Sequence, residues 1–248
     1  MSGIGTGYDL SVSTFSPDGR VFQTEYAQKA VDSSGTVVGL RCKDGVVLGA
    51  EKLIISKMLV ENSNRRTFPV DRHAGVAVAG LAADGRAVVD RAQSEAQQYK
   101  GFYGHCIPGH VLAERLASYV HVFNLYWYVR PMGVTSLLGV YDEEGPALYA
   151  VDPAGTVHRY YGTAVGKGRQ AARNEIEKLR PGELTVREGV RAVAQILHRV
   201  HDEEKPFEAE LAWVCEESGR TFQRVPQELV DEAERLAKEA LEAEDMDD

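Results

Sequence analysis

The sequence has few cysteines, no long apolar run and no excess of basic residues, and each absence excludes a class of protein. Three cysteines among 248 residues, widely spaced and without a CxxC pair, exclude a disulfide framework and favour reduced, mostly buried thiols in an intracellular protein. The longest apolar run, near 76–83, is far too short to span a bilayer, so no membrane partner is expected. The first four residues lack the basic start and apolar core of a secretory signal.

The net charge of −9 is concentrated at one end of the chain. Residues 228–248 have a net charge of −8, which leaves the rest of the chain nearly neutral at −1. A neutral body without a basic stripe argues against nucleic acid as a partner. The acidic end predicts a helix that begins at Pro226 and a solvated tail over Glu242–Asp248.

Hydrophobic periodicity predicts antiparallel strands in blocks and helices in pairs. A chain that is 44% hydrophobic and 26% charged fits a single domain over 1–248, with an N-terminal segment (1–34), a body (35–225) and a C-terminal helix and tail (226–248). Helices are expected near 20–31, 88–96, 112–123, 168–179, 186–200 and beyond 226, and strands near 36–40, 46–50, 53–56, 67–70, 74–79, 135–141, 147–151, 156–161, 207–214 and 221–225. This order predicts an α+β fold of two stacked antiparallel sheets with a helix pair on each outer face.

The most informative segment is Tyr8–Val31, which combines a polar lead, a turn and a short helix. Ser16-Pro17-Asp18-Gly19 is typical of a tight turn, because proline presets φ and serine can bond back to the backbone. The helix expected over 20–31 is too short to be stable alone in water. It must therefore dock on its own domain or on a neighbouring copy.

The segment Tyr8–Val31 resembles the N-terminal signature of the alpha-type subunits of the 20S proteasome. Further motifs similar to that family lie at 41–47, 70–73, 76–84, 129–134, 152–155 and 164–168, so the resemblance spans almost the whole chain. The lead at 5–11, the HDE run at 201–203 and the acidic tail resemble one paralogue group within the family.

This resemblance implies a fold, a set of partners and a cellular role. The fold is the four-layer αββα sandwich of N-terminal-nucleophile hydrolases, with an added N-terminal helix. The role is that of a cofactor-free structural subunit in the seven-membered outer alpha ring, in contact with other alpha-type subunits, beta-type subunits and regulatory particles. The resemblance also implies localisation in the cytoplasm and nucleus and a role in ubiquitin-dependent and ubiquitin-independent protein degradation.

The main alternative is an active hydrolase that is cut before Thr36. Active relatives use an N-terminal threonine, whose own amine is the base. Counting back from the turn glycine Gly45 places the nucleophile's position on Gly35, one residue before Thr36. Glu51 stands where active members place Asp, and Arg66 stands where they place Lys. An arginine stays protonated, so it cannot take the part of that lysine's tunable amine. We therefore predict no catalytic residue.

The resemblance also implies a gate. The family's gate-opening cluster maps onto Tyr8, Asp9, Pro17 and Tyr26. A tyrosine hydroxyl and a carboxylate can lock by hydrogen bonding, and a rigid proline turn can move the attached tail. Where most alpha subunits have an arginine after the Tyr-Asp pair, this chain has Leu10, which cannot form that arginine's ion pair.

A pocket that receives the C-terminal carboxylate of a docking regulator is the third implication. Its basic residue maps onto Arg66, and its flanking glycines map onto Ser34, a substitution, and Gly80. Arginine can bind a carboxylate through two parallel hydrogen bonds.

Two other motifs are assigned no ligand. The run at 166–169 precedes a helix but lacks the spacing of a phosphate-binding loop, which favours a structural turn. His198, His201, Asp202 and Glu203 gather at one helix end, where they favour a dipole-stabilised terminus over a metal site.

Overall fold

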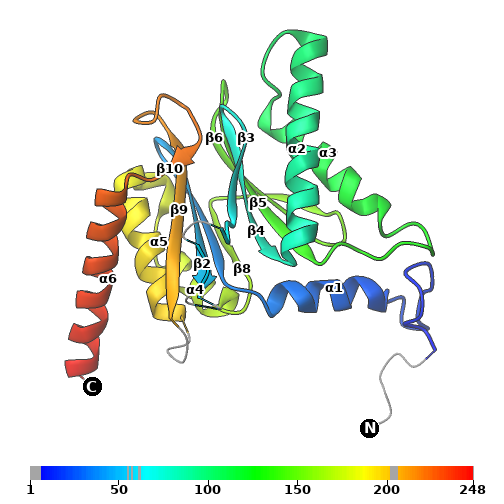
Figure 1. Cartoon of the computed structure of the whole chain (residues 1–248), viewed down its shortest axis with the longest axis horizontal. Coiled ribbons are helices and arrows are strands. Elements are labelled where there is room, and N and C mark those ends of the chain that lie inside the picture. The colour runs from blue at the N-terminus through cyan, green and yellow to red at the C-terminus, as the bar shows by residue number, and fades with distance from the viewer. Residues whose placement is uncertain (1–6, 55, 57, 61–62, 202–205, 248) are drawn as a thin grey trace.

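Two antiparallel five-stranded sheets lie face to face at the centre of the molecule, and helices cover both outer faces (Figure 1). The structure is a computed structural model that describes residues 7–54, 56, 58–60, 63–201 and 206–247, with only the backbone described over 243–247. This arrangement confirms the predicted sandwich of sheets between helix layers.

The first sheet contains both the N-terminal and the C-terminal strands of the body. Its order is β10-β9-β2-β1-β8. The strands are β1 (Val37–Cys42), β2 (Gly45–Leu53), β8 (Gly162–Val165), β9 (Phe207–Cys215) and β10 (Gln223–Arg224). Strand β2 is central and is paired along its whole length with β9, from Gly45 opposite Cys215 to Leu53 opposite Phe207.

The second sheet is built from strands that are consecutive in the chain. Its order is β3-β4-β5-β6-β7. The strands are β3 (Thr67–Asp71), β4 (Ala74–Gly80), β5 (Val134–Asp142), β6 (Gly145–Val151) and β7 (Val157–Tyr160). Each neighbour in this sheet is therefore a hairpin partner or is joined through the helix pair between β4 and β5.

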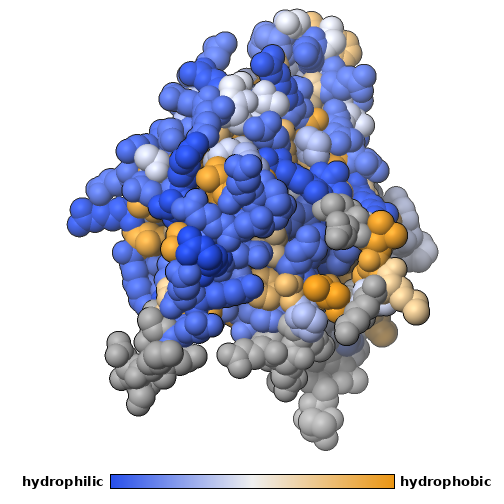
Figure 2. All heavy atoms as spheres, turned by 60° about the vertical axis from the view of Figure 1, so that its left-hand side comes forward, coloured by the Kyte–Doolittle hydropathy of each residue, from blue (hydrophilic) through white to orange (hydrophobic). Residues whose placement is uncertain are grey.

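The helices lie in separate layers. Helices α2 (Ala82–Tyr103) and α3 (Gly109–Val122) cover the second sheet, and α4 (Arg169–Glu177) and α5 (Val186–Val200) cover the first. A short 3₁₀ helix (Pro181–Glu183) precedes α5. Helix α6 (Gln227–Asp247) packs beside α5 and continues into the segment that we expected to be a solvated tail. Figure 2 looks toward the α6 side, where hydrophilic residues predominate and hydrophobic ones form separate patches.

Three hydrophobic clusters fill the spaces between these layers. The cluster between the sheets includes Val46, Leu48, Leu137 and Leu148, which are all fully buried. A second cluster joins the first sheet to α4, α5 and α6, and a third joins the second sheet to α2 and α3. Burial of a large aliphatic side chain is worth about 1.5–3 kcal/mol, so this layered core is the main source of stability. Among the described helices, none combines the length and the hydropathy that a membrane span requires.

Two local predictions were wrong. The single strand expected over 156–161 is two strands in different sheets, because the chain crosses from the second sheet to the first at Tyr161. No separate strand starts at Leu53, since β2 extends through that residue. The helix expected near 112–123 is confirmed as α3, which ends at Val122, and a series of turns follows it.

Helix α1 (Phe22–Asp32) lies outside the sandwich and docks on its own domain (Figure 1). Its inner side buries Phe22, Ala27 and Val31, and the helix packs against β4 and β5. The Thr24 hydroxyl donates to the Asn124 side-chain oxygen at 2.8 Å, which ties α1 to the end of α3. The docking partner that the short helix needs is therefore present within the chain.

Candidate gate and docking site

The turn before α1 is closed by hydrogen bonds at both of its ends. The Gly19 amide donates to the Ser16 carbonyl at 2.9 Å, and the Arg20 amide donates to the Ser16 hydroxyl at 3.1 Å. Gly19 has a φ of +74°, a value that glycine adopts at little cost. These bonds confirm the turn predicted at 16–19 and make it a compact unit around Pro17.

A hydrogen bond joins the polar lead to the exposed side of α1. The Tyr26 hydroxyl donates to Asp9 Oδ2 at 3.1 Å. Gln23, three residues before Tyr26 and so on the same side of the helix, donates to the Asp9 backbone carbonyl. The pKa of Tyr26 is raised, mainly by partial desolvation and next by the hydrogen bond to Asp9. The hydroxyl therefore keeps the proton that it donates. Sequence reasoning missed Gln23, although its three-residue spacing from Tyr26 is a usable signal.

The other two predicted gate residues lie close in sequence but are not bonded to this pair. In the described part of the chain, no hydrogen bond joins Tyr8 or Pro17 to Asp9 or Tyr26. Tyr8 is 43% exposed, and Leu10 is 87% exposed. Side chains so exposed are available to a neighbouring molecule.

Exposed aromatic residues continue this surface beyond α3. Tyr126, Trp127 and Tyr128 are all at least 45% exposed and contact one another through their rings. The bond between Thr24 and Asn124 places this segment next to α1. A cluster of exposed aromatic side chains of this kind is typical of a protein interface.

Two of the predicted pocket residues are in direct contact. Arg66, just before β3, donates from Nη1 to the Gly80 carbonyl at 2.9 Å, and its backbone amide donates to Glu210 at 2.9 Å. Burial lowers the pKa of Arg66, while the charge of Glu210 acts in the opposite direction. The Arg66 side chain is thus half-buried and held at the end of β4.

The third pocket residue, Ser34, follows the end of α1. Its hydroxyl donates to the Val31 carbonyl at 2.7 Å, and its own carbonyl accepts from the Lys167 amide at 2.9 Å. In the described part of the chain, no hydrogen bond joins it to Arg66 or Gly80.

Thr36, just before β1, is buried and bonded to other parts of the chain. Its amide donates to Glu51 Oε2 at 2.7 Å, and its hydroxyl accepts from the Gly168 amide at 3.1 Å. The other Glu51 oxygen lies 2.6 Å from His201 Nδ1. Thr36, Glu51 and His201 are nearly or fully buried, so the threonine amide and hydroxyl serve as structural groups.

The two motifs without an assigned ligand lie at the turn before α4 and at the end of α5. Gly166 has a φ of +100° and a backbone packed against Gly35, as expected for a turn. His201 pairs with Glu51, and neither it nor His198 belongs to a cluster of metal-ligating side chains among the described residues. Asp202 and Glu203 lie outside the described residues.

Comparison with known proteins identifies the chain's family. The proteasome subunit profile matches residues 31–214, and the N-terminal signature of A-type proteasome subunits matches residues 8–30. The chain is 60% identical to the alpha type-3 proteasome subunit of Arabidopsis thaliana and 59% identical to that of Spinacia oleracea, each over 100% of both chains. It is 51% identical to the alpha type-3 proteasome subunit of Dictyostelium discoideum over 99% of this chain and 100% of that one.

The paralogue group suggested by the lead, the HDE run and the acidic tail is this alpha type-3 group. The signature match covers the segment that a hydrolase cut before Thr36 would have to lose, so that alternative is wrong. The chain belongs to the proteasome subunit family and, within it, to the alpha-type subunits, which are non-catalytic.

Proposed function

We propose that this subunit occupies one position of a seven-membered outer alpha ring and contributes to a gate and to a regulator dock. Its partners are the adjacent alpha-type subunits, the beta-type subunits of the inner ring and regulatory particles. It acts in ubiquitin-dependent and ubiquitin-independent protein degradation in the cytoplasm and nucleus. Within a single domain, residues 1–34 serve the gate, 35–225 form the body, and 226–248 form the C-terminal helix and acidic end.

The observation that carries the gate is the hydrogen bond between Tyr26 and Asp9. Both partners lie at the surface, so the bond is exchangeable for the same bond to a neighbouring alpha-type protein. The turn around Pro17 is closed by hydrogen bonds between Ser16 and both Gly19 and Arg20, and the lead is covalently continuous with Ser16. A displacement of this compact turn therefore moves the lead. Tyr8 and the exposed aromatic residues at 126–128 supply contact area for the neighbour.

We expect Tyr26→Phe to reduce regulator-stimulated peptide hydrolysis by the assembled particle several-fold. The substitution keeps the ring that packs on α1 and removes only the hydroxyl that bonds Asp9. The measurement is the rate of hydrolysis of a short fluorogenic peptide with and without an activating regulator, in particles that contain the variant chain.

Tyr103→Phe is the matched control, because it removes an exposed hydroxyl at the far end of α2. It should leave stimulation unchanged. Equal stimulation of the Tyr26→Phe, Tyr103→Phe and wild-type particles would remove Tyr26 from the gate.

The dock rests on Arg66, whose guanidinium has five N–H donors and uses one of them on the Gly80 carbonyl. The remaining donors suit a carboxylate at the C-terminus of a regulator. Ser34 and Gly80 line the same approach in this proposal. The contact to Gly80 holds the arginine in place, which lowers the entropy lost on binding.

We expect Arg66→Ala to weaken the binding of a regulator-derived peptide by about tenfold or more, since a hydrogen bond to a charged group contributes about 1.5–3 kcal/mol. Fluorescence anisotropy of the labelled peptide on assembled particles measures this affinity. The same peptide with an amidated C-terminus is the control and should bind wild type and variant equally weakly. An unchanged affinity for the free-acid peptide would reject the assignment.

A further inference from the structure

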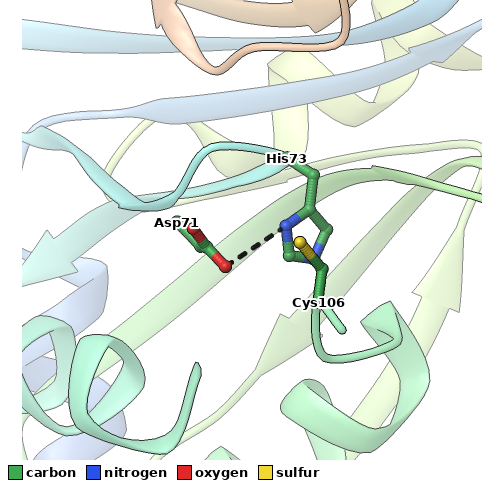
Figure 3. A group of neighbouring side chains, drawn as sticks. All are labelled: Asp71, His73 and Cys106. Atoms are coloured by element: carbon green, nitrogen blue, oxygen red, sulfur yellow. Dashed lines mark ion pairs between the residues drawn. The ribbon is translucent and has the colours of Figure 1, made fainter. Parts of the chain in front are cut away.

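Three potential metal ligands meet between the β3–β4 turn and the loop that follows α2. Asp71 ends β3, His73 precedes β4, and Cys106 lies between α2 and α3. One ligand atom from each residue lies within 4.8 Å of the other two. Figure 3 shows the Asp71 carboxylate directed at the imidazole of His73, with the Cys106 sulfur beside the same ring.

The imidazole of His73 is oriented as a metal-binding histidine would be. Its Nε2 lies 2.8 Å from the Ile107 carbonyl, which can only accept, so Nε2 carries the proton. In the neutral ring the lone pair is then on Nδ1. A ligating histidine commonly donates its other ring N–H to a backbone carbonyl, which fixes the tautomer and the ring orientation. His73 is only 7% exposed, so this orientation is well defined.

Two buried polar atoms in the cluster have no hydrogen-bond partner among the residues that the structure describes. They are Asp71 Oδ2 and His73 Nδ1, which lie 3.6 Å apart, too far for a good hydrogen bond. The other Asp71 oxygen accepts from the Arg72 amide at 2.7 Å, which holds the carboxylate in place. An acceptor lone pair and a carboxylate facing each other away from water carry a desolvation cost. A cation between them satisfies both.

The kinds of donor atom select the cation. A thiolate, an imidazole and a carboxylate suit Zn²⁺, whereas Mg²⁺ and Ca²⁺ prefer oxygen ligands alone. The carboxylate and the thiolate together neutralise a divalent charge. His73 and Cys106 also line an open groove of about 600 Å³, so a fourth coordination position is accessible from outside.

The same residue types also occur in cysteine nucleophile triads, but the geometry here does not suit one. A triad histidine uses one nitrogen for the nucleophile and the other for the acid. His73 commits Nε2 to the Ile107 carbonyl, which leaves only Nδ1 for both Asp71 and Cys106. Donor atoms from three side chains that all face one point in space are instead the arrangement of a metal site.

We propose that Asp71, His73 and Cys106 form a Zn²⁺ site with an open fourth position, which ties the β3–β4 turn to the α2–α3 loop. Cys106 must release its proton when it binds, so the site exchanges one proton for the metal. The fourth position takes water or a donor group from a molecule in the groove.

The test is titration of the full-length, reduced, metal-free chain with Zn²⁺ by calorimetry and with Co²⁺ by absorption spectroscopy. We expect one equivalent to bind and a thiolate-to-cobalt band to appear in the near ultraviolet. Cys106→Ser should abolish that band and weaken Zn²⁺ binding by about 100-fold or more, beyond the loss seen when an outer-shell partner is removed. His73→Gln should weaken Zn²⁺ binding to a similar extent. The glutamine side-chain amide can still donate to the Ile107 carbonyl, so that hydrogen bond is kept.

His110→Gln is the matched control, because His110 lines the same groove without belonging to the cluster. It should bind Zn²⁺ as the wild type does. Cys106 is exposed, so its serine variant is expected to fold, which circular dichroism of the metal-free chain checks. Absence of the cobalt–thiolate band in the wild type, or equal Zn²⁺ affinity in the wild type and Cys106→Ser, would overturn the proposal.

Discussion

Glu51→Ala should lower the unfolding midpoint of the chain by about 6–12 °C, which corresponds to about 3 kcal/mol for a domain of this size. Glu51 is 7% exposed, and its two oxygens accept from the Thr36 amide and contact His201. Removal of one partner from a buried ionic or hydrogen-bonded group costs about 3–5 kcal/mol, because the other groups keep their desolvation cost. The loss should appear in thermal unfolding followed by circular dichroism.

Two further variants separate the lost bonds from lost volume and lost charge. Glu51→Gln keeps an acceptor oxygen and nearly the same volume, so its midpoint should lie between those of wild type and Glu51→Ala. Glu239→Ala removes a carboxylate that is 55% exposed and paired with Arg235 on α6, and should stay within about 0.5 kcal/mol of wild type. If Glu51→Ala has the same unfolding midpoint as the wild type, the buried carboxylate does not hold β1 to the end of α5.

Gly80→Ala should destabilise the chain by about 3 kcal/mol or more. Gly80 has a φ of +120°, which costs a residue with a side chain about 1–3 kcal/mol. A Cβ at this position would also clash with the Gly133 carbonyl oxygen. That oxygen accepts from the Leu81 amide at 2.9 Å, so moving it away breaks a backbone hydrogen bond worth about 1 kcal/mol. Urea unfolding measures the sum.

Gly104→Ala isolates the conformational part of this cost. Gly104 caps the C-terminal end of α2 with a φ of +76°, but a Cβ there would have no atom of a described residue within 4 Å to clash with. Its substitution should cost about 1–2 kcal/mol, which is the cost of the left-handed conformation alone. Equal losses for Gly80→Ala and Gly104→Ala would show that the carbonyl of Gly133 relaxes freely.

Hydrophobic periodicity predicted most of the fold, since the sandwich needs only alternating strands and striped helices. This prediction failed where tertiary contacts decide which strand an extended segment pairs with. Residues 156–161 have the pattern of one extended run, yet the strands on the two sides of Tyr161 pair with β6 in one sheet and β1 in the other. Local sequence pattern carries no information about which sheet an extended segment joins.

The candidate sites divide in the same way. Asp9 and Tyr26 could be named from the N-terminal signature because both lie within one short segment, and the structure joins them by a hydrogen bond. The contact between Arg66 and Gly80 joins residues flanking one hairpin. The Asp71, His73 and Cys106 cluster could not be predicted, because its cysteine comes from a loop more than 30 residues away and shows no ligand spacing with the other two.

The pairing of β2 with β9 has a consequence for the order of events during synthesis. A ribosome delivers the chain from its N-terminus, so β3–β7 can all pair as they emerge. The central strand β2 lacks one neighbour until Phe207–Cys215 has been made, and until then it presents an open edge. The nascent chain therefore needs protection at that edge for most of its translation, and it becomes competent for assembly only when its last strands leave the exit tunnel.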